Sequence, residues 1–359
     1  MAKCDLMVMT YNIGLSQQQV DTIVDLGRTP NARPRNSSEV DKRKKVRHSL
    51  TSMSLLLTEH QPDIMVVQEV GGHEEGLQPR DLPDFIDFIE NMWSSAPFPG
   101  ERPLAMYEMH SDKSYLCFAR KGRAQVLGTD VFKLVRDIPE QTWRDAQLVD
   151  IMVTPQASGA AHTRPPPGGS PPSSAGTRVR IVNAHLVSGR KAHSSGHDHS
   201  LNFQTRLECL QNATKAAVAE RQGHKPAVSL VAGDFNIDSD GILLAKFGHA
   251  LERNHAWCIN DRASHKDFIL STGADVRSTI PRSRWRDADA LRVKPGGAHW
   301  PIAMTFSWQP ADLPTLPPSA NPGSSLVKRA KQLVEEAEQQ ASAIVITIWA
   351  FCRLVWAFC

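Results

Sequence analysis

Five side chains that can bind a metal ion or move a proton follow apolar runs of this chain. They are Asn12, Glu69, His185, Asp234 and Asn236. Each comes where a run of apolar residues, typical of a buried strand, ends. Carboxylate, amide and imidazole groups at strand ends are what metal-assisted hydrolysis of a phosphate ester requires. The residue types therefore predict an active site at which several strands end.

The elements that must position these side chains form a mixed α/β pattern. Helical periodicity predicts helices at 38–60, 81–93 and 202–221, with Ser38 as the N-cap of the first. Strands that alternate with helices indicate a domain of layered sheets. The apolar runs predict strands at 6–13, 64–70, 114–119, 147–154, 179–186, 228–233, 268–271 and 302–308.

The composition bounds the class of protein. The chain has 359 residues, of which 41% are hydrophobic and 22% charged, as in soluble globular proteins. A net charge of +3 is too small to indicate nucleic-acid binding by itself. Its six cysteines include no CxxC pair, which argues against a zinc ribbon or a disulfide framework and favours reduced thiols. With no signal peptide expected, we predict an intracellular protein, cytoplasmic or nuclear.

The chain is expected to divide into a catalytic domain, a linker and a C-terminal segment. The catalytic domain covers 1–308, and its Pro-, Gly- and Ser-rich stretch 154–177 predicts a disordered loop that joins a hairpin. The Pro-rich stretch 309–324 predicts the linker. Residues 325–359 predict a charged helix followed by an apolar tail. A helix of about 20 apolar residues can span a membrane, so tail anchoring and packing against protein are both open for 341–359.

Six short phrases with polar residues occur in a fixed order between residues 7 and 306. They are Y-N-I at 11–13, Q-E-V at 68–70, N-A-H-L at 183–186, G-D-F-N at 233–236, H-K-D-F-I-L-S at 265–271 and A-H-W-P-I at 298–302. One phrase alone is a weak signal, and the ordered set is a strong one. The set resembles the endonuclease/exonuclease/phosphatase superfamily, which includes the DNase-I-like nucleases. The resemblance implies an α/β fold of four layers, in which two packed mixed or antiparallel sheets are flanked by helices.

The resemblance also implies a metal site and a water-activating group. Asn12 and Glu69 would bind Mg²⁺, for which Mn²⁺ can substitute, and a carboxylate is a hard oxygen ligand suited to magnesium. Asp234 would position and deprotonate the attacking water, while Asn236 would hold that water or a phosphate oxygen. Side chains two apart share a face in extended backbone, which suits a joint task. Taken alone, Asn12 also fits a turn, Glu69 a solvated carboxylate and Asp234 an Asx-turn.

Two imidazoles are implied to face the phosphate. His185 would contact the scissile phosphate, and His299 would be the second imidazole, oriented by Asp267 on the preceding strand. A carboxylate behind an imidazole fixes its tautomer and favours its charged form. The chain departs from the family at Ala298, because an aspartate usually precedes the last histidine. This departure opens the alternative of a catalytically weakened binding module.

Basic residues outside these phrases are further candidates for substrate binding. Lys42 and Arg43 belong to a basic stretch at 28–47, in which only two residues are acidic. Such a stretch can meet a polyanion, act as a nuclear signal or form a solvated surface. Arg144 lies shortly before a predicted strand and either faces the substrate or is exposed.

Together these residues favour a magnesium-dependent phosphodiester hydrolase, with nucleic acid as the leading substrate. The alternative is an inositol-phosphate phosphatase or a sphingomyelinase-type phosphodiesterase of the same superfamily, acting on a phosphorylated small molecule or a lipid. Against the inositol phosphatases, the phrase at 233–236 is not followed by Tyr-Arg. The loops 15–37, 71–83 and 187–200 would choose the substrate, and they carry no signature of one. The sequence leaves the oligomeric state open.

Overall fold

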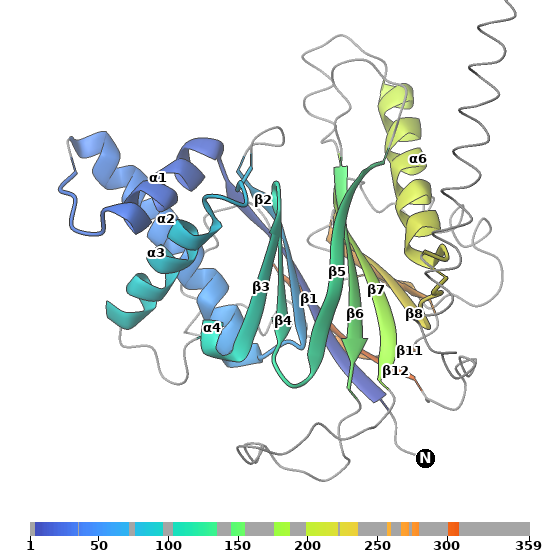
Figure 1. The fold of residues 1–359 in the computed structure, drawn as a ribbon. Coiled ribbons are helices and arrows are strands. Elements are labelled where there is room, and N and C mark those ends of the chain that lie inside the picture. Colours follow the sequence, from blue (N-terminus) through green and yellow to red (C-terminus); the bar gives the residue numbers. More distant parts are fainter. Residues whose placement is uncertain are drawn as a thin grey trace, which may run out of the picture. The chain divides into compact units, whose positions relative to one another are not determined.

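Two sheets of six strands each organise the described part of the chain (Figure 1). The computed structural model describes residues 4–34, 36–71, 76–95, 103–134, 145–154, 176–186, 199–221, 223–235, 257–259, 267–272, 275–279 and 301–308. All of them belong to the unit Met1–Leu313, which is distinct from the unit Pro314–Cys359. The predicted linker, charged helix and apolar tail lie outside the described residues and stay predictions.

The first sheet has the strand order β11-β12-β1-β2-β4-β3. β1 and β2 run parallel, whereas β12 pairs with β1, and β4 with β2, in the antiparallel sense. The parallel pair makes β1 and β2 end at the same edge of the sheet. The strands are β1 (Cys4–Leu15), β2 (Ile64–Val70), β3 (Tyr107–Asp112), β4 (Tyr115–Arg120), β11 (Asp275–Thr279) and β12 (Ile302–Trp308).

The second sheet has the strand order β5-β6-β7-β8-β10-β9. β7 and β8 run parallel, so they too end at one edge. β6 and β7 are antiparallel, with Val153 opposite Thr177, and so form the predicted hairpin; the interior of its loop, 155–175, lies outside the described residues. The strands are β5 (Ala124–Lys133), β6 (Asp145–Val153), β7 (Thr177–His185), β8 (Val228–Asp234), β9 (Trp257–Ile259) and β10 (Asp267–Thr272).

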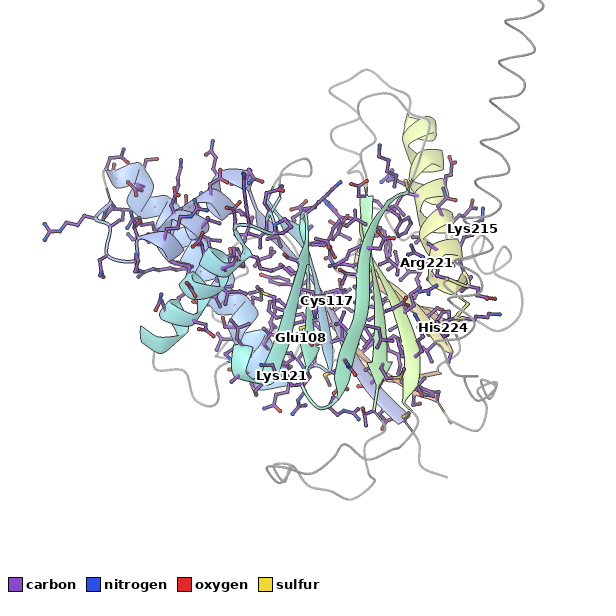
Figure 2. The ribbon with its side chains drawn as sticks, in the orientation of Figure 1. Glu108, Cys117, Lys121, Lys215, Arg221 and His224 are labelled. Atoms are coloured by element: carbon purple, nitrogen blue, oxygen red, sulfur yellow. The ribbon has the colours of Figure 1, made fainter. Side chains whose placement is uncertain are left out.

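Strand alternation divides the buried residues into distinct layers. On β1, Leu6 and Val8 face the second sheet, whereas Met9 and Tyr11 face the opposite way, toward the helices. Side chains from both sheets fill the space between them, and Cys117 of β4 lies within it (Figure 2). Both faces of the central strands are therefore buried, which explains why these strands read as nearly continuous apolar runs.

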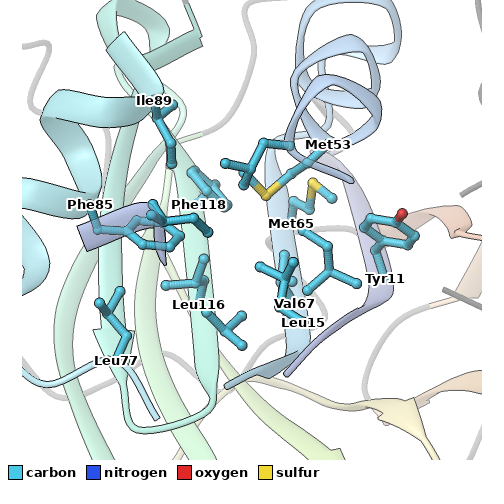
Figure 3. Packing of buried hydrophobic residues seen from close by; sticks show 14 of the residues in the cluster. Tyr11, Leu15, Met53, Met65, Val67, Leu77, Phe85, Ile89, Leu116 and Phe118 are labelled. Atoms are coloured by element: carbon cyan, nitrogen blue, oxygen red, sulfur yellow. The ribbon is translucent and has the colours of Figure 1, made fainter. Parts of the chain in front are cut away.

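Helices cover the outer face of the first sheet. Apolar side chains of α1, α2 and α3 pack there against Met65, Val67, Leu116 and Phe118 (Figure 3). The helices are α1 (Gln17–Arg28), α2 (Ser37–Leu55), which continues as a π-helical turn over Leu56–His60, α3 (Leu82–Ser95) and the short α4 (Pro103–Met106).

One long helix, α6 (His199–Val218), covers the outer face of the second sheet (Figure 1). Its residues Cys209 and Ala213 share a buried cluster with Val182 of β7 and Val231 of β8. The layers therefore run helix, sheet, sheet, helix, and the predicted four-layer α/β sandwich is confirmed. Among the described residues, no helix is long and apolar enough to cross a membrane.

The helices and strands predicted within the described residues are present, and two predictions about the region between β1 and β2 were wrong. Residues 15–37, expected to be a substrate-choosing loop, contain α1, which begins with a capping box between Ser16 and Gln19. The next helix is capped by Asn36 and not by Ser38: the Asn36 side chain accepts a hydrogen bond from the Glu39 amide at 2.9 Å. The N-cap thus lies two residues before the predicted one.

Candidate active site at the edge of both sheets

The ends of four strands bring four of the predicted side chains together. Asn12 comes from β1, Glu69 from β2, His185 from β7 and Asp234 from β8. Asn12 Nδ2 donates to Asp234 Oδ2 at 3.0 Å. His185 Nε2 lies 3.0 Å from Glu69 Oε1 and 3.6 Å from Asp234 Oδ2. Each sheet supplies two members of this site, so the site spans the gap between the sheets.

Strand register explains why the four side chains meet. In the parallel pair β7–β8, His185 is the register partner of Asp234, and the two side chains share the face toward the first sheet. In the pair β1–β2, Asn12 lies beside Gln68, one residue before Glu69. The backbone of Asp267 lies opposite Asp234 in the antiparallel pair β8–β10, at this same edge.

Glu69 reaches the site through an unusual backbone conformation. By strand alternation Val66 and Gln68 face the second sheet, so Glu69 would point at the helices. Its φ of 57° lies in the left-handed region, and its carboxylate instead contacts His185, while Val70 returns to the helix-covered core. A non-glycine residue in this region costs about 1–3 kcal/mol, and such strain gathers at functional sites. No local sequence signal announces this conformation.

Burial separates the roles that the two carboxylates can play. The side chain of Glu69 is 36% exposed, whereas that of Asp234 is 1% exposed and that of His185 is 5% exposed. Asn12 is also buried, and its Oδ1 accepts a hydrogen bond from the Gly14 amide at 3.1 Å. An open carboxylate can take a cation from solvent, whereas a buried and oriented one is suited to a proton held at a fixed place.

The charges of the site favour a cation. Two carboxylates converge on one imidazole, and the Asn12 amide group donates a hydrogen bond to one of those carboxylates. Among the residues that the structure describes, no group of three or more His, Cys, Asp or Glu side chains forms a metal centre. A metal ion here would depend on Glu69 together with the Asn12 amide oxygen and water.

A further ion pair at the same edge was not predicted. Lys113, in the turn between β3 and β4, makes a short contact with the Asp145 carboxylate at the start of β6. The next residue, Ala146, pairs with Ala184, so Asp145 lies beside the end of β7 that carries His185. Unlike the predicted site residues, Lys113 does not come at the end of an apolar run. It reaches Asp145 only because the two sheets lie close together.

The structure does not bring Lys42 and Arg43 to these four side chains. Both lie on α2, whose buried side packs on the outer face of the first sheet. Arg43 is engaged locally, since it donates to Glu39 Oε1 at 2.5 Å and to the Ala32 carbonyl at 2.6 Å. Arg144, Asn236, Ala298 and His299 and the side chain of Asp267 lie outside the described part of the chain.

The sandwich of helix, sheet, sheet and helix, with side chains converging at its strand ends, is the architecture that the resemblance of the six phrases implied. No family model matches the chain, and no curated protein matches it. Among solved structures, a humanized D. rerio TDP2 is 14% identical with a TM-score of 0.43, over 84% of this chain and 98% of that chain. An endonuclease/exonuclease/phosphatase family protein from Bacteroides thetaiotaomicron is 14% identical with a TM-score of 0.46, over 86% and 100%.

ANGEL2, a 2′,3′-cyclic phosphatase, is a third similar structure. It is 12% identical with a TM-score of 0.47, over 85% of this chain and 95% of that chain. At such identities and TM-scores the likeness says nothing about activity. The chemistry of this chain therefore has to follow from its own residues.

Proposed function

We propose that this chain is a metal-dependent phosphodiester hydrolase that acts on nucleic acid. The observation that supports it is the convergence of Asn12, Glu69, His185 and Asp234 at one edge of the sandwich, with contacts of 3.0 Å across the gap between the sheets. Two carboxylates, an amide and an imidazole supply the groups that activate water and stabilise a phosphoryl group.

Asp234 is the proposed general base. Its carboxylate is buried, and the hydrogen bond from Asn12 Nδ2 fixes the orientation of that carboxylate. A base held in one orientation takes a proton from a water molecule at a defined position, which contributes about 10²–10⁴-fold to the rate. Asn236, two residues further on, is proposed to hold the same water or a phosphate oxygen.

Glu69 and Asn12 are the proposed ligands of Mg²⁺, or of Mn²⁺ in its place. The donor set fits a hard cation, because the partly exposed Glu69 carboxylate and the Asn12 Oδ1 amide oxygen are oxygen ligands. Magnesium keeps several of its waters, so two protein ligands suffice for it. When bound, the ion would polarise the phosphoryl oxygen and neutralise its developing charge.

His185 is the proposed donor to the phosphoryl group. Its Nε2 faces the two carboxylates, so the same nitrogen is directed at the place where substrate and metal would meet. His299, oriented by Asp267, is proposed as the second imidazole. The backbone of Asp267 at the edge beside Asp234 supports this part of the assignment.

A basic helix face supports nucleic acid as the substrate. Lys42, Lys44, Lys45 and Arg47 are exposed on α2, where they can meet phosphates at a distance from the reacting one. Such contacts add affinity without reading sequence. A phosphorylated small molecule would not reach these residues while its phosphate is at the site. Nucleic acid and small-molecule substrates can therefore be told apart by experiment.

A cleavage assay with the full chain tests the proposal. Single-stranded, double-stranded and abasic DNA, RNA, a phosphoinositide and sphingomyelin are each incubated with Mg²⁺ or with EDTA. We expect metal-dependent cleavage of a nucleic acid that falls at least about 100-fold in Glu69→Gln. The matched control is Glu108→Gln, an exposed carboxylate on β3 (Figure 2) that should change nothing. Wild-type inactivity on every substrate, or full activity in Glu69→Gln, would contradict the proposal.

A further inference from the structure

A chain of buried amide side chains crosses from one sheet to the other directly behind the site. Gln68 Nε2 donates to Asn183 Oδ1 at 2.6 Å, and Asn183 Nδ2 donates to Gln147 Oε1 at 3.0 Å. Gln147 Nε2 then donates to Asp112 Oδ2 at 2.9 Å, which returns the chain to the first sheet. All three amide side chains are fully buried. We call these four residues the amide chain.

The amide chain has one possible direction. Asp112 is an acceptor as a carboxylate, so Gln147 must present its NH₂ group to it. Gln147 Oε1 is then left to accept from Asn183, whose Oδ1 in turn accepts from Gln68. The direction leaves Gln68 Oε1 buried with no hydrogen-bond partner among the described residues. A buried unsatisfied acceptor is costly, so its retention needs an explanation beyond simple cohesion.

The amide chain is joined to the site through the backbone. Gln68 immediately precedes the strained Glu69, and Asn183 lies two residues before His185 on the same face of β7. Asn183 Nδ2 also donates to the Val67 carbonyl at 3.1 Å, so it is hydrogen-bonded directly to the backbone of β2. The hydrogen bonds therefore fix the ends of β2 and β7 relative to each other.

From this geometry we infer that Gln68, Asn183, Gln147 and Asp112 are positioning residues that set the distance between Glu69 on one sheet and His185 on the other. None of them touches the reacting atoms. This inference rests on the proposed function, because the two side chains that it positions are the proposed metal ligand and phosphate donor. A misplacement of about 1 Å in such a group can cost about 10²-fold in rate.

A hydrogen bond at the other end of the sandwich provides the matched comparison. Trp308 Nε1 on β12 donates to Thr177 Oγ1 on β7 at 3.1 Å, and both residues are buried. This bond also joins the two sheets, but it lies at the opposite end of β7 from His185. Thr177→Val therefore removes a bond between the sheets without touching the amide chain.

The test compares kcat, KM and Tm of Gln147→Met and Thr177→Val on the cleaved substrate. Methionine keeps the size of Gln147, and Asn183 retains its bond to Val67, so the variant should fold. We expect Gln147→Met to lower kcat by about 10- to 100-fold with KM within about twofold, because positioning acts in the transition state. Thr177→Val should leave kcat unchanged. An equal fall in kcat in both variants, or an unchanged kcat in Gln147→Met, overturns the inference.

Two further measurements keep the inference falsifiable. Asp112→Asn is a mild change at a partly exposed position, and it removes the group that imposes the direction, so kcat should fall by a few-fold. Hydrogen exchange at residues 66–70 and 181–186 needs no activity: it should quicken at both strand ends in Gln147→Met and at neither in Thr177→Val. Wild-type inactivity would overturn the proposed function alone, whereas equal exchange in the two variants would overturn the positioning role.

Discussion

An Asp150→Asn substitution tests whether a buried ion pair stabilises the strand pair that carries His185. Asp150 on β6 lies opposite Arg180 on β7, and the Arg180 side chain is 0% exposed. Arg180 Nε lies 2.7 Å from Asp150 Oδ1, and Nη2 atoms of Arg180 and Arg178 each lie 3.2 Å from Asp150 Oδ2. The Asp150 carboxylate thus compensates a guanidinium that has no access to water.

The expected loss of stability follows from that burial. Removing one partner of a buried ion pair costs about 3–5 kcal/mol, and because asparagine keeps one acceptor we expect about 3 kcal/mol. For a unit of the size of Met1–Leu313 that corresponds to a fall in Tm of roughly 5 °C. The control is Asp130→Asn, which breaks the exposed pair with Arg221 and should cost about 1 kcal/mol or less.

The stability that Asp150 contributes should also depend on pH. Burial alone would raise the pKa of Asp150, but the hydrogen bonds and charges of Arg180 and Arg178 outweigh burial and lower it. A lowered folded-state pKa gives stability that is fully present above the unfolded-state value of about 3.9 and is lost as pH falls through the folded-state value. Urea unfolding should show a full difference between wild type and Asp150→Asn from pH 7 down to about pH 4, and a difference that shrinks as the pH falls further. A difference that does not shrink below about pH 4, or that matches the Asp130→Asn control, would refute the reasoning.

Three other predictions concern the site itself. Asp234→Asn should lower kcat by about 10²–10⁴-fold, because it removes the proposed base. Its Tm should be nearly unchanged, because the asparagine oxygen still accepts a hydrogen bond from Asn12. Near-normal turnover would exclude Asp234 as the base. Glu69→Gly should lose hydrolysis but gain stability. Its free energy of unfolding in urea should rise by about 1 kcal/mol, because glycine adopts the left-handed conformation freely. A less stable variant would contradict the claim that Glu69 is strained. Gly233→Ala should destabilise the fold by at least about 3 kcal/mol, because at the Gly233 φ of 140° a Cβ would lie 1.9 Å from the Ala184 carbonyl oxygen. An unchanged Tm in this variant would contradict the close contact.

The fold was predictable where burial leaves a strong local pattern. The run Ile64–Val70 is buried on both faces, so its apolar residues identified β2 to the residue. β5 escaped prediction because only one of its ten residues is fully buried and it contains Gln125, Gly128 and Asp130. α1 was also missed, although its buried Val20, Ile23 and Val24 recur at helical spacing and Ser16 with Gln19 forms a capping box. Patterns of hydrophobicity report burial, and exposed elements leave little trace of it.

The sequence identified which residues form the site, but not the backbone conformation that brings them together. The order of the phrases brought Asn12, Glu69, His185 and Asp234 into one prediction, and the structure places these four together. The left-handed conformation of Glu69 could not be read from the sequence, since it depends on a contact with the other sheet. Charge alone likewise grouped Lys42 with the site, although α2 covers the opposite face of the first sheet.

The division of the site between two sheets makes the spacing of the sheets a chemical variable. Asn12 and Glu69 move with the first sheet, and His185 and Asp234 move with the second. The contacts of 3.0 Å between them therefore change with any shift of one sheet against the other. Apolar packing resists such a shift without selecting one exact spacing, whereas hydrogen bonds hold atoms to within a few tenths of an ångström. A site of this kind needs directional bonds behind it, and the amide chain supplies them at the one end of the sandwich where the four side chains meet.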